Sequence, residues 1–103
     1  MTKVTGSFYF KLTVNGNLIG EFTNNHSDGI TVEAANRNDA GNSFIGNYQT
    51  SWREGNTYSA DLSITFRENS NQLKFELLWK GTNIFRGEGF LVDGILIGHY
   101  YSE

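Results

Sequence analysis

Apolar and polar side chains alternate along most of the chain, which is the period-two pattern of strands that bury one face. The alternation is clearest over residues 58–67, where Tyr, Ala, Leu, Ile and Phe occupy one face and Ser, Asp, Thr and Arg the other. Seven further segments carry the same pattern, at residues 7–14, 18–23, 30–34, 44–50, 73–79, 85–91 and 96–100. The pattern therefore predicts eight strands.

The segments between these strands are short and polar. Asn15-Gly16 and Asp93-Gly94 are pairs typical of two-residue hairpin turns. Further turns are expected over residues 24–29, 53–56, 68–71 and 80–81. Because connections of this length join antiparallel neighbours, each strand is expected to pair with the next one along the chain.

A strongly twisted antiparallel sheet of this size tends to close on itself, since closure removes exposed strand edges. We therefore predict an all-β protein in which residues 1–103 form a single eight-stranded antiparallel up-and-down barrel. Several glycines at inward positions suit the crowded interior of such a barrel. They are Gly20, Gly46, Gly87, Gly89 and Gly98. An open sandwich of the same strands is the alternative architecture.

The segment after the second strand has the weakest pattern. We expect Ile30, Val32 and Ala34 to share the inner face of a short strand, with Thr31 and Glu33 on its polar face. A short helix over residues 32–38 is the alternative interpretation. Residues 36–42, NRNDAGN, have no periodicity and are expected to form a loop.

Composition agrees with this fold class. The chain of 103 residues contains twelve glycines, twelve asparagines and no proline, and 15% of its residues are aromatic. Glycine and asparagine favour hairpin turns, and aromatic side chains bury large areas. The net charge of −3 and the scattered basic residues argue against a nucleic-acid surface. The absence of cysteine excludes disulfides and thiolate metal sites.

The first residues, MTKVTGSFYF, lack the apolar segment of a secretory signal, and no apolar run in the sequence is long enough for a membrane-spanning helix. We therefore expect a cytoplasmic protein that contacts neither a membrane nor a nucleic acid. A mature secreted protein would have the same sequence features.

The inner faces of the predicted strands combine large aromatic rings with a few groups that form hydrogen bonds. Apolar walls with a few convergent polar groups are typical of a ligand pocket. Buried tyrosine hydroxyls and the indole N–H of Trp79 would each need a partner. We therefore expect the barrel to bind a small apolar or aromatic molecule, without a cofactor or a metal. The residues expected to bind it are Tyr48, Thr50, Tyr58, Phe75, Trp79, Phe85 and Tyr100.

Three alternatives remain open. The aromatic residues can simply fill the barrel, because eight strands enclose a space just wide enough to be filled or to hold one small ligand. An apolar barrel can also act as a cyclase or isomerase that holds a reactive conformer beside tyrosine hydroxyls, without a metal or a nucleophile. A carbohydrate-binding module is the third, with Tyr9, Trp52 and Tyr101 as exposed rings. His26 and His99 are expected on the surface.

Three stretches resemble the avidin and streptavidin family. Residues 44–50, FIGNYQT, resemble its Leu-Thr-Gly-Thr-Tyr-x-Ser strand, and residues 77–80, LLWK, with Asn83 resemble its Val-Ala-Trp-Lys-Asn turn. Residues 85–89, FRGEG, stand where that family has Trp-Ser-Gly-Gln-Tyr. The resemblance covers residues 44–91, and lipocalin-like calycins more broadly share the single up-and-down barrel.

This resemblance implies that Tyr48, Thr50, Trp79 and Phe85 line the mouth of a ligand cavity. It does not extend to biotin, because the first strand lacks the Asn and Ser that hold the polar head of biotin in that family. The terminal strand that supplies the family's Asp also has no counterpart before Glu103. A site that recognises a polar head by hydrogen bonds loses most of its affinity without those groups.

The outer faces of the last three strands are more apolar than the outer faces of the first and fifth strands. A contiguous apolar patch on adjacent strands is typical of a contact surface between proteins. We therefore expect a homodimer or a higher homo-oligomer through this outer face. Its residues are Leu78, Ile84, Phe90, Val92, Ile95 and Ile97.

Overall fold

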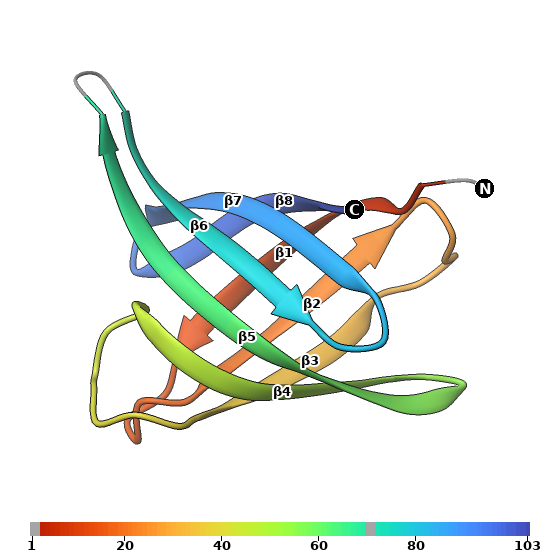
Figure 1. The fold of residues 1–103 in the computed structure, drawn as a ribbon, viewed down its shortest axis with the longest axis horizontal. Helices are drawn as coiled ribbons and strands as arrows, with labels where there is room; N and C mark the ends of the chain where they lie inside the picture. The colour runs from red at the N-terminus through yellow and green to blue at the C-terminus, as the bar shows by residue number, and fades with distance from the viewer. Residues whose placement is uncertain (1–2, 70–71) are drawn as a thin grey trace.

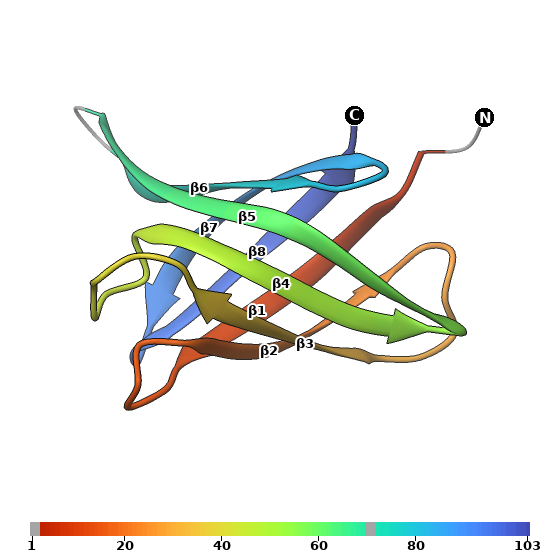
Figure 2. The same ribbon diagram turned by 60° about the horizontal axis from the view of Figure 1, so that its bottom comes forward.

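The computed structural model describes residues 3–69 and 72–103, which form a closed antiparallel barrel (Figure 1, Figure 2). Its strands are β1 (Thr5–Leu12), β2 (Leu18–Asn24), β3 (Thr31–Arg37), β4 (Gly46–Glu54), β5 (Asn56–Asn69), β6 (Gln72–Lys80), β7 (Ile84–Val92) and β8 (Ile95–Ser102). Each strand pairs with its neighbours in the sequence, and β1 pairs with β8 to close the barrel. The predicted up-and-down barrel is confirmed, and the sandwich is excluded.

The two ends of the barrel differ in what they carry. The turns after β2, β4 and β6 lie at the same end as both termini, on the right in Figure 1, and we call this end the mouth. The turns after β1, β3 and β7 lie at the opposite end, which we call the base. The turn expected over residues 68–71 includes residues 70 and 71, which lie outside the described residues. No helix long and apolar enough to cross a membrane occurs in residues 3–69 or 72–103.

Two turns of the base show how local sequence sets the strand ends. Asp93 and Gly94 both have positive φ, 51° and 78°, as a primed two-residue hairpin requires. Around Gly16 the turn is wider than expected, because Thr13 N–H donates to the Asn17 carbonyl at 2.8 Å. The first strand therefore ends at Leu12, and Val14, two residues beyond its end, is fully exposed in the turn.

Residues 31–37 form strand β3, so the helix alternative is wrong and the strand interpretation is confirmed. The expected orientation of this strand is wrong, however. Glu33 and Ala35 are buried, whereas Val32 is 56% exposed. Paired residues of neighbouring strands share a face, and β3 pairs with β2 through Gly20 and Glu33. This register turns Glu33 into the barrel.

Some inward positions are exposed because their strands are longer than the barrel is deep. Strand β5 has 14 residues; at its start it pairs with β4 and extends beyond β6, and at its end it pairs with β6 and extends beyond β4 (Figure 2). Tyr58 and Phe66, near its ends, are therefore 43% and 38% exposed, although Leu62 between them is fully buried. The connection expected over residues 53–56 is a tight turn at Gly55, whose φ is 77°.

The interior between the centre of the barrel and the base is filled by side chains. The most deeply buried apolar residues there are Phe10, Leu18, Leu62, Ile64 and Leu96. They belong to four different strands and form one hydrophobic core. Side chains therefore fill this part of the barrel.

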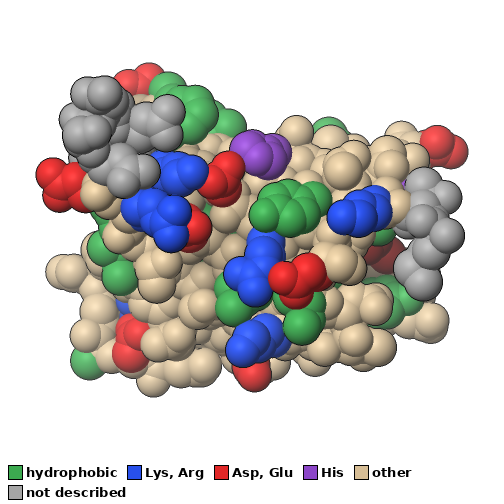
Figure 3. All heavy atoms as spheres, turned by 45° about the horizontal axis from the view of Figure 1, so that its top comes forward, with side chains coloured by type: hydrophobic (Ala, Val, Ile, Leu, Met, Phe, Trp, Pro, Cys, Tyr) green, Lys and Arg blue, Asp and Glu red, His purple; other side chains and the backbone are tan. Residues whose placement is uncertain are grey.

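The outer face of β6, β7 and β8 is less uniform than the sequence pattern indicated. Phe90 and Ile97 are exposed and paired with each other, as expected. Between them and Ile84, however, Glu88 faces His99 across the two strands at 3.6 Å. Figure 3 shows charged side chains dispersed among the hydrophobic ones on this face. The apolar residues thus form two groups, and we call the larger one, Phe90, Val92, Ile95 and Ile97, the outer patch.

Candidate functional site

A cavity of about 180 Å³ opens at the mouth of the barrel. Its walls are aromatic side chains from six strands of the barrel. They are Phe8, Phe22, Trp52, Trp79, Phe85 and Tyr100. Asn24, His26 and Glu54 also line it, and all three lie at or near the turns of the mouth. Glu33 is the one buried carboxyl group among the described residues that line it.

Glycines on neighbouring strands make room for two of these rings. Tyr100 is paired with Gly6 on one side and with Gly87 on the other. A Cβ atom on Gly6 would lie 2.7 Å from the ring of Tyr100, and one on Gly87 would lie 3.0 Å from the ring of Trp79. Both distances are too short for an unstrained contact, so the aromatic wall depends on these two glycines.

Glu33 is fixed by two hydrogen bonds from side chains on other strands. The indole Nε1–H of Trp79 donates to its Oε2 atom at 2.9 Å, and the hydroxyl of Thr50 donates to the same oxygen at 2.5 Å. All three side chains are buried. Gly20 is the partner of Glu33 on β2, and a Cβ atom at Gly20 would lie 2.8 Å from the ring of Phe10, so this position also requires glycine.

The second carboxyl oxygen of Glu33 faces the cavity. The described residues supply no hydrogen-bond donor to Oε1, since both bonds end on Oε2. Among these same residues, no buried side-chain oxygen or nitrogen lacks a partner. Oε1 is therefore not sealed in the protein interior, and it is accessible from the cavity that Glu33 lines.

The two central polar groups of the cavity hold their protons differently. Burial raises the pKa of Glu33 to about 7, although the hydrogen bonds from Thr50 and Trp79 act in the opposite direction. Burial also raises the pKa of Tyr100 to about 12, against a smaller opposite effect of the hydrogen bond from Asn24 at 3.0 Å. Near neutral pH, Glu33 can therefore gain or lose a proton, whereas Tyr100 stays protonated.

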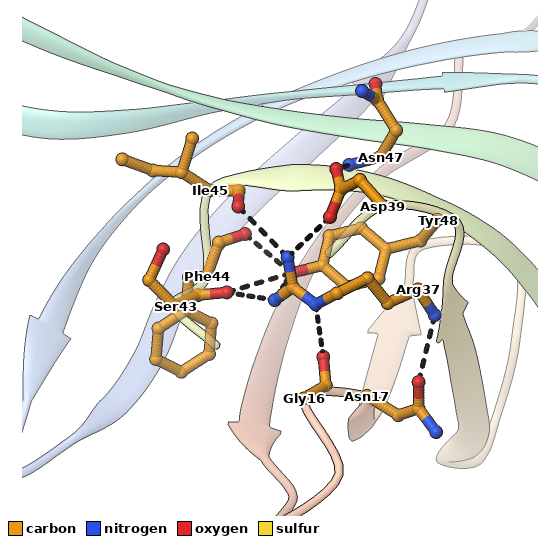
Figure 4. A network of polar contacts seen from close by, with 9 residues as sticks. All are labelled: Gly16, Asn17, Arg37, Asp39, Ser43, Phe44, Ile45, Asn47 and Tyr48. Atoms are coloured by element: carbon orange, nitrogen blue, oxygen red, sulfur yellow. Dashed lines mark hydrogen bonds and ion pairs between the residues drawn. The ribbon is translucent and has the colours of Figure 1, made fainter. Parts of the chain in front are cut away.

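At the base, Arg37 closes the barrel (Figure 4). Only 4% of its side chain is exposed, and its guanidinium group also lies 4.8 Å from the centre of the Tyr48 ring. The group donates to the Tyr48 hydroxyl at 2.7 Å and to the Asp39 carboxylate at 3.0 Å. It also donates to the backbone carbonyls of Gly16, Ser43 and Ile45. This network joins the turn after β1 to the segment that connects β3 and β4.

Three of the residues predicted to bind a ligand line the mouth cavity, namely Trp79, Phe85 and Tyr100. Thr50 is close by and contributes through its hydrogen bond to Glu33. Tyr58 lies at the same end and stacks on Trp52 with 6.0 Å between ring centres, but it is not part of the lining.

The other two predicted residues lie toward the base. Tyr48 is completely buried, and its hydroxyl donates to the Phe44 carbonyl at 2.7 Å. Phe75 packs against Phe44 and stacks on Phe66 with 4.8 Å between ring centres. The structure therefore separates the seven residues into two sets at opposite ends of the barrel.

The sequence interpretation missed Glu33 and misjudged Trp52. Glu33 was assigned to the polar face because Ile30 and Val32 have a stronger apolar signal. Trp52 was expected on the surface, yet it is half-buried in the cavity wall, edge-on to Phe22. The one signal that pointed to an internal acceptor was the indole N–H of Trp79, which needed a partner.

Comparison with protein-family models, with curated proteins and with solved structures finds no match to this chain. The closed eight-stranded up-and-down barrel agrees with a calycin-like architecture. The likeness to the avidin family is therefore one of architecture, and the site has to be interpreted from its own residues.

Proposed function

We propose that the protein binds a small organic molecule in the mouth cavity, with the aromatic side chains as walls and Glu33 as the central polar contact. The observation that carries this proposal is the accessible Oε1 atom of an otherwise buried carboxyl group. Burying a carboxyl with an unused acceptor lowers stability, and such groups occur preferentially at functional sites. A ligand donor at this position would complete the hydrogen bonds of Glu33.

The size of the cavity indicates the size of the ligand. An apolar cavity of roughly 150 Å³ is enough to hold benzene. The mouth cavity, at about 180 Å³, is thus suited to one ring with a short substituent. Because the cavity is open at the mouth, a longer molecule can extend from it into solvent.

The alternatives have less support. The filled core accounts for the part of the interior nearer the base, but not for the cavity. The carbohydrate-binding alternative relied on three exposed rings, and Trp52 faces the interior while Tyr9 and Tyr101 lie on outward positions of β1 and β8. The structure does not bring these rings together into a stacking surface.

Binding can be measured with the tryptophan fluorescence of the protein. The chain has two tryptophans, and both line the cavity, so the signal comes from the proposed site. A library of one-ring compounds should contain members that change this fluorescence and raise the melting temperature, since a ligand of the native state stabilises it.

A matched pair of variants on β7 locates the binding. Phe85→Ala removes a cavity wall, whereas Phe90→Ala removes the same side chain from the outer face. We expect Phe85→Ala to weaken binding at least about tenfold, the equivalent of roughly 1.4 kcal/mol, and Phe90→Ala to leave it unchanged. Equal effects of the two substitutions, or no response to any compound, would contradict the proposal.

A second candidate function is isomerisation by proton transfer. It is favoured by the combination of Glu33, whose pKa is about 7, with Tyr100, whose hydroxyl remains a donor. Glu33 would take a proton from a carbon next to a carbonyl, Tyr100 would donate a hydrogen bond to the enolate oxygen, and Glu33 would return the proton to a carbon. Deuterium exchange into the methyl group of acetophenone, followed by NMR, tests this step. Exchange that is no faster with the wild type than with Glu33→Gln contradicts it.

A further inference from the structure

We propose that the ligand of the mouth cavity carries one positive charge: the geometry points to an organic amine whose ammonium group donates to Oε1 of Glu33 while its apolar part contacts the aromatic walls. This inference rests on the proposed binding function and adds the chemical class of the ligand. It follows from the orientation of Glu33, from the charges around the cavity and from the nature of the walls.

Two hydrogen bonds fix the orientation of the Glu33 carboxyl group. Trp79 and Thr50 hold Oε2 from two directions, so the carboxyl group cannot rotate freely and Oε1 is presented to the cavity. A glutamine could accept the same two hydrogen bonds without the cost of burying a charge. The carboxyl group adds one property that an amide lacks, a full negative charge, and this property attracts a cation.

The charges around the cavity also favour a cationic ligand. Its lining includes the carboxyl groups of Glu33 and Glu54, and the described lining residues include no lysine and no arginine. The ion pairs found within residues 3–69 and 72–103 do not include Glu33. A buried carboxylate without a protein counter-ion leaves its charge available to a bound cation.

The walls suit the rest of such a ligand. Aromatic rings carry negative potential on their faces and attract ammonium groups, and cages of aromatic side chains bind organic cations in other proteins. Here Phe22 is edge-on to Trp52 and to Tyr100, each with 6.0 Å between ring centres. Phe8 is edge-on to Trp79 at 5.6 Å. The rings thus surround the space next to Glu33 on several sides.

Binding of a cation should displace a proton. In the free protein at mildly acidic pH Glu33 is protonated, and an ammonium group beside it favours the carboxylate form. The other titratable groups that line the cavity are His26, Glu54 and Tyr100. Because His26 is the one histidine among the described residues that line the cavity, the test includes a His26 variant.

The test compares 2-phenylethylamine, which is a cation at pH 8, with 2-phenylethanol, which is neutral and has the same shape. Both are titrated into the wild type and into Glu33→Gln, with tryptophan fluorescence and calorimetry as readouts. At pH 8 we expect the wild type to bind the amine at least about tenfold more tightly than the alcohol, and Glu33→Gln to bind the two within about threefold.

The pH dependence gives a measurement on the unaltered protein. At pH 5, where Glu33 is protonated, the preference of the wild type for the amine should fall several-fold. At pH 6 the amine should release a substantial fraction of one proton on binding, measured from the calorimetric heats in two buffers of different ionisation enthalpy. His26→Gln can change the affinity for both compounds because His26 lines the cavity, but its preference for the amine should still fall several-fold from pH 8 to pH 5.

Four outcomes overturn the inference. If the wild type binds the alcohol as tightly as the amine, or if Glu33→Gln keeps the preference for the amine, the ligand is not a cation held by Glu33, while the binding site itself stands. If His26→Gln removes the pH dependence, the preference for the amine depends on the charge of His26 and not on that of Glu33. If neither compound changes the fluorescence or gives heat, the inference and the proposed binding function fail together.

Discussion

The indole N–H of Trp79 donates a hydrogen bond to Oε2 of Glu33 at 2.9 Å, and this bond crosses the interior of the barrel from β6 to β3. The two strands are not neighbours in the sheet, so the bond joins opposite walls. With the bond from Thr50 on β4, it places a buried carboxyl group below the aromatic rings of the mouth. The site is thus built from residues far apart in the sequence.

Glu33 should make the stability of the protein depend on pH. Its pKa is about 7 in the folded state and is expected near 4.5 in the unfolded state. Between these values the folded state binds the proton that the unfolded state has lost, so the free energy of unfolding falls as pH rises. The loss begins above about pH 4.5, is complete above about pH 7 and amounts to roughly 3 kcal/mol.

The variant Glu33→Gln isolates this effect, because all other titrating groups are shared with the wild type. We expect the two proteins to have similar stability near pH 4 and the variant to be roughly 3 kcal/mol more stable at pH 8. Urea unfolding at several pH values between 4 and 8 measures the difference. A difference between the two proteins that does not change with pH would show that Glu33 titrates alike in both states.

Thr50→Val should remove one of the two hydrogen bonds to Glu33 with little change in shape. Because hydrogen bonds to charged groups are worth roughly 1.5–3 kcal/mol and those to neutral groups about 1 kcal/mol, the destabilisation should be larger at pH 8 than at pH 4. Thr50→Ser, which keeps the hydroxyl, is the control and should show a cost that does not depend on pH. Equal pH dependence in both variants would argue against the bond.

Arg37 should stabilise the base without affecting the mouth. Arg37→Lys keeps the charge but has a single nitrogen in place of the planar group that contacts three carbonyls, so we expect a loss of roughly 3 kcal/mol. Tyr48→Phe removes one hydroxyl from the same network and should cost about 1–2 kcal/mol. Urea unfolding measures both costs, and ligand titration should find unchanged affinity at the mouth.

The outer patch is the surface through which we propose that the protein forms a homo-oligomer. Sedimentation at high micromolar concentration should show a dimer or a larger species. Phe90→Lys places a charge within the patch and should yield the monomer with little change in melting temperature, because this side chain is exposed. Ile84 lies beyond the charged pair of Glu88 and His99, outside the outer patch, so Ile84→Lys serves as the control. A wild type that sediments as a monomer contradicts the proposal.

Local patterns predicted the barrel because each strand carries its own signal. Residues 58–66 alternate so regularly that Leu62 and Ile64 could be assigned to the core, and the hairpin at Asp93-Gly94 could be read from two residues. Because short connections pair each strand with the next one, few topologies of the eight strands then remained possible. The three predicted cavity residues on β6, β7 and β8 followed from the same alternation.

The orientation of β3 could not be predicted in this way. Ile30, Val32 and Ala34 favour one face, and Ala35 alone favours the other. What decides between them is the register with β2 and the hydrogen bonds that Glu33 receives from Thr50 and Trp79, 17 and 46 residues further along the chain. A local period contains no information about such partners, and the central residue of the site was missed for this reason.

The closed base has a practical consequence for anyone who works with this protein. Arg37 and its partners close one end, so in the binding mode that we propose a molecule in the cavity would be held by one tip, with the remainder directed outward through the mouth. A linker, a dye or a solid support attached at that outer end would not have to enter the protein. The chain could therefore serve as a compact capture reagent that recognises the terminus of a larger compound.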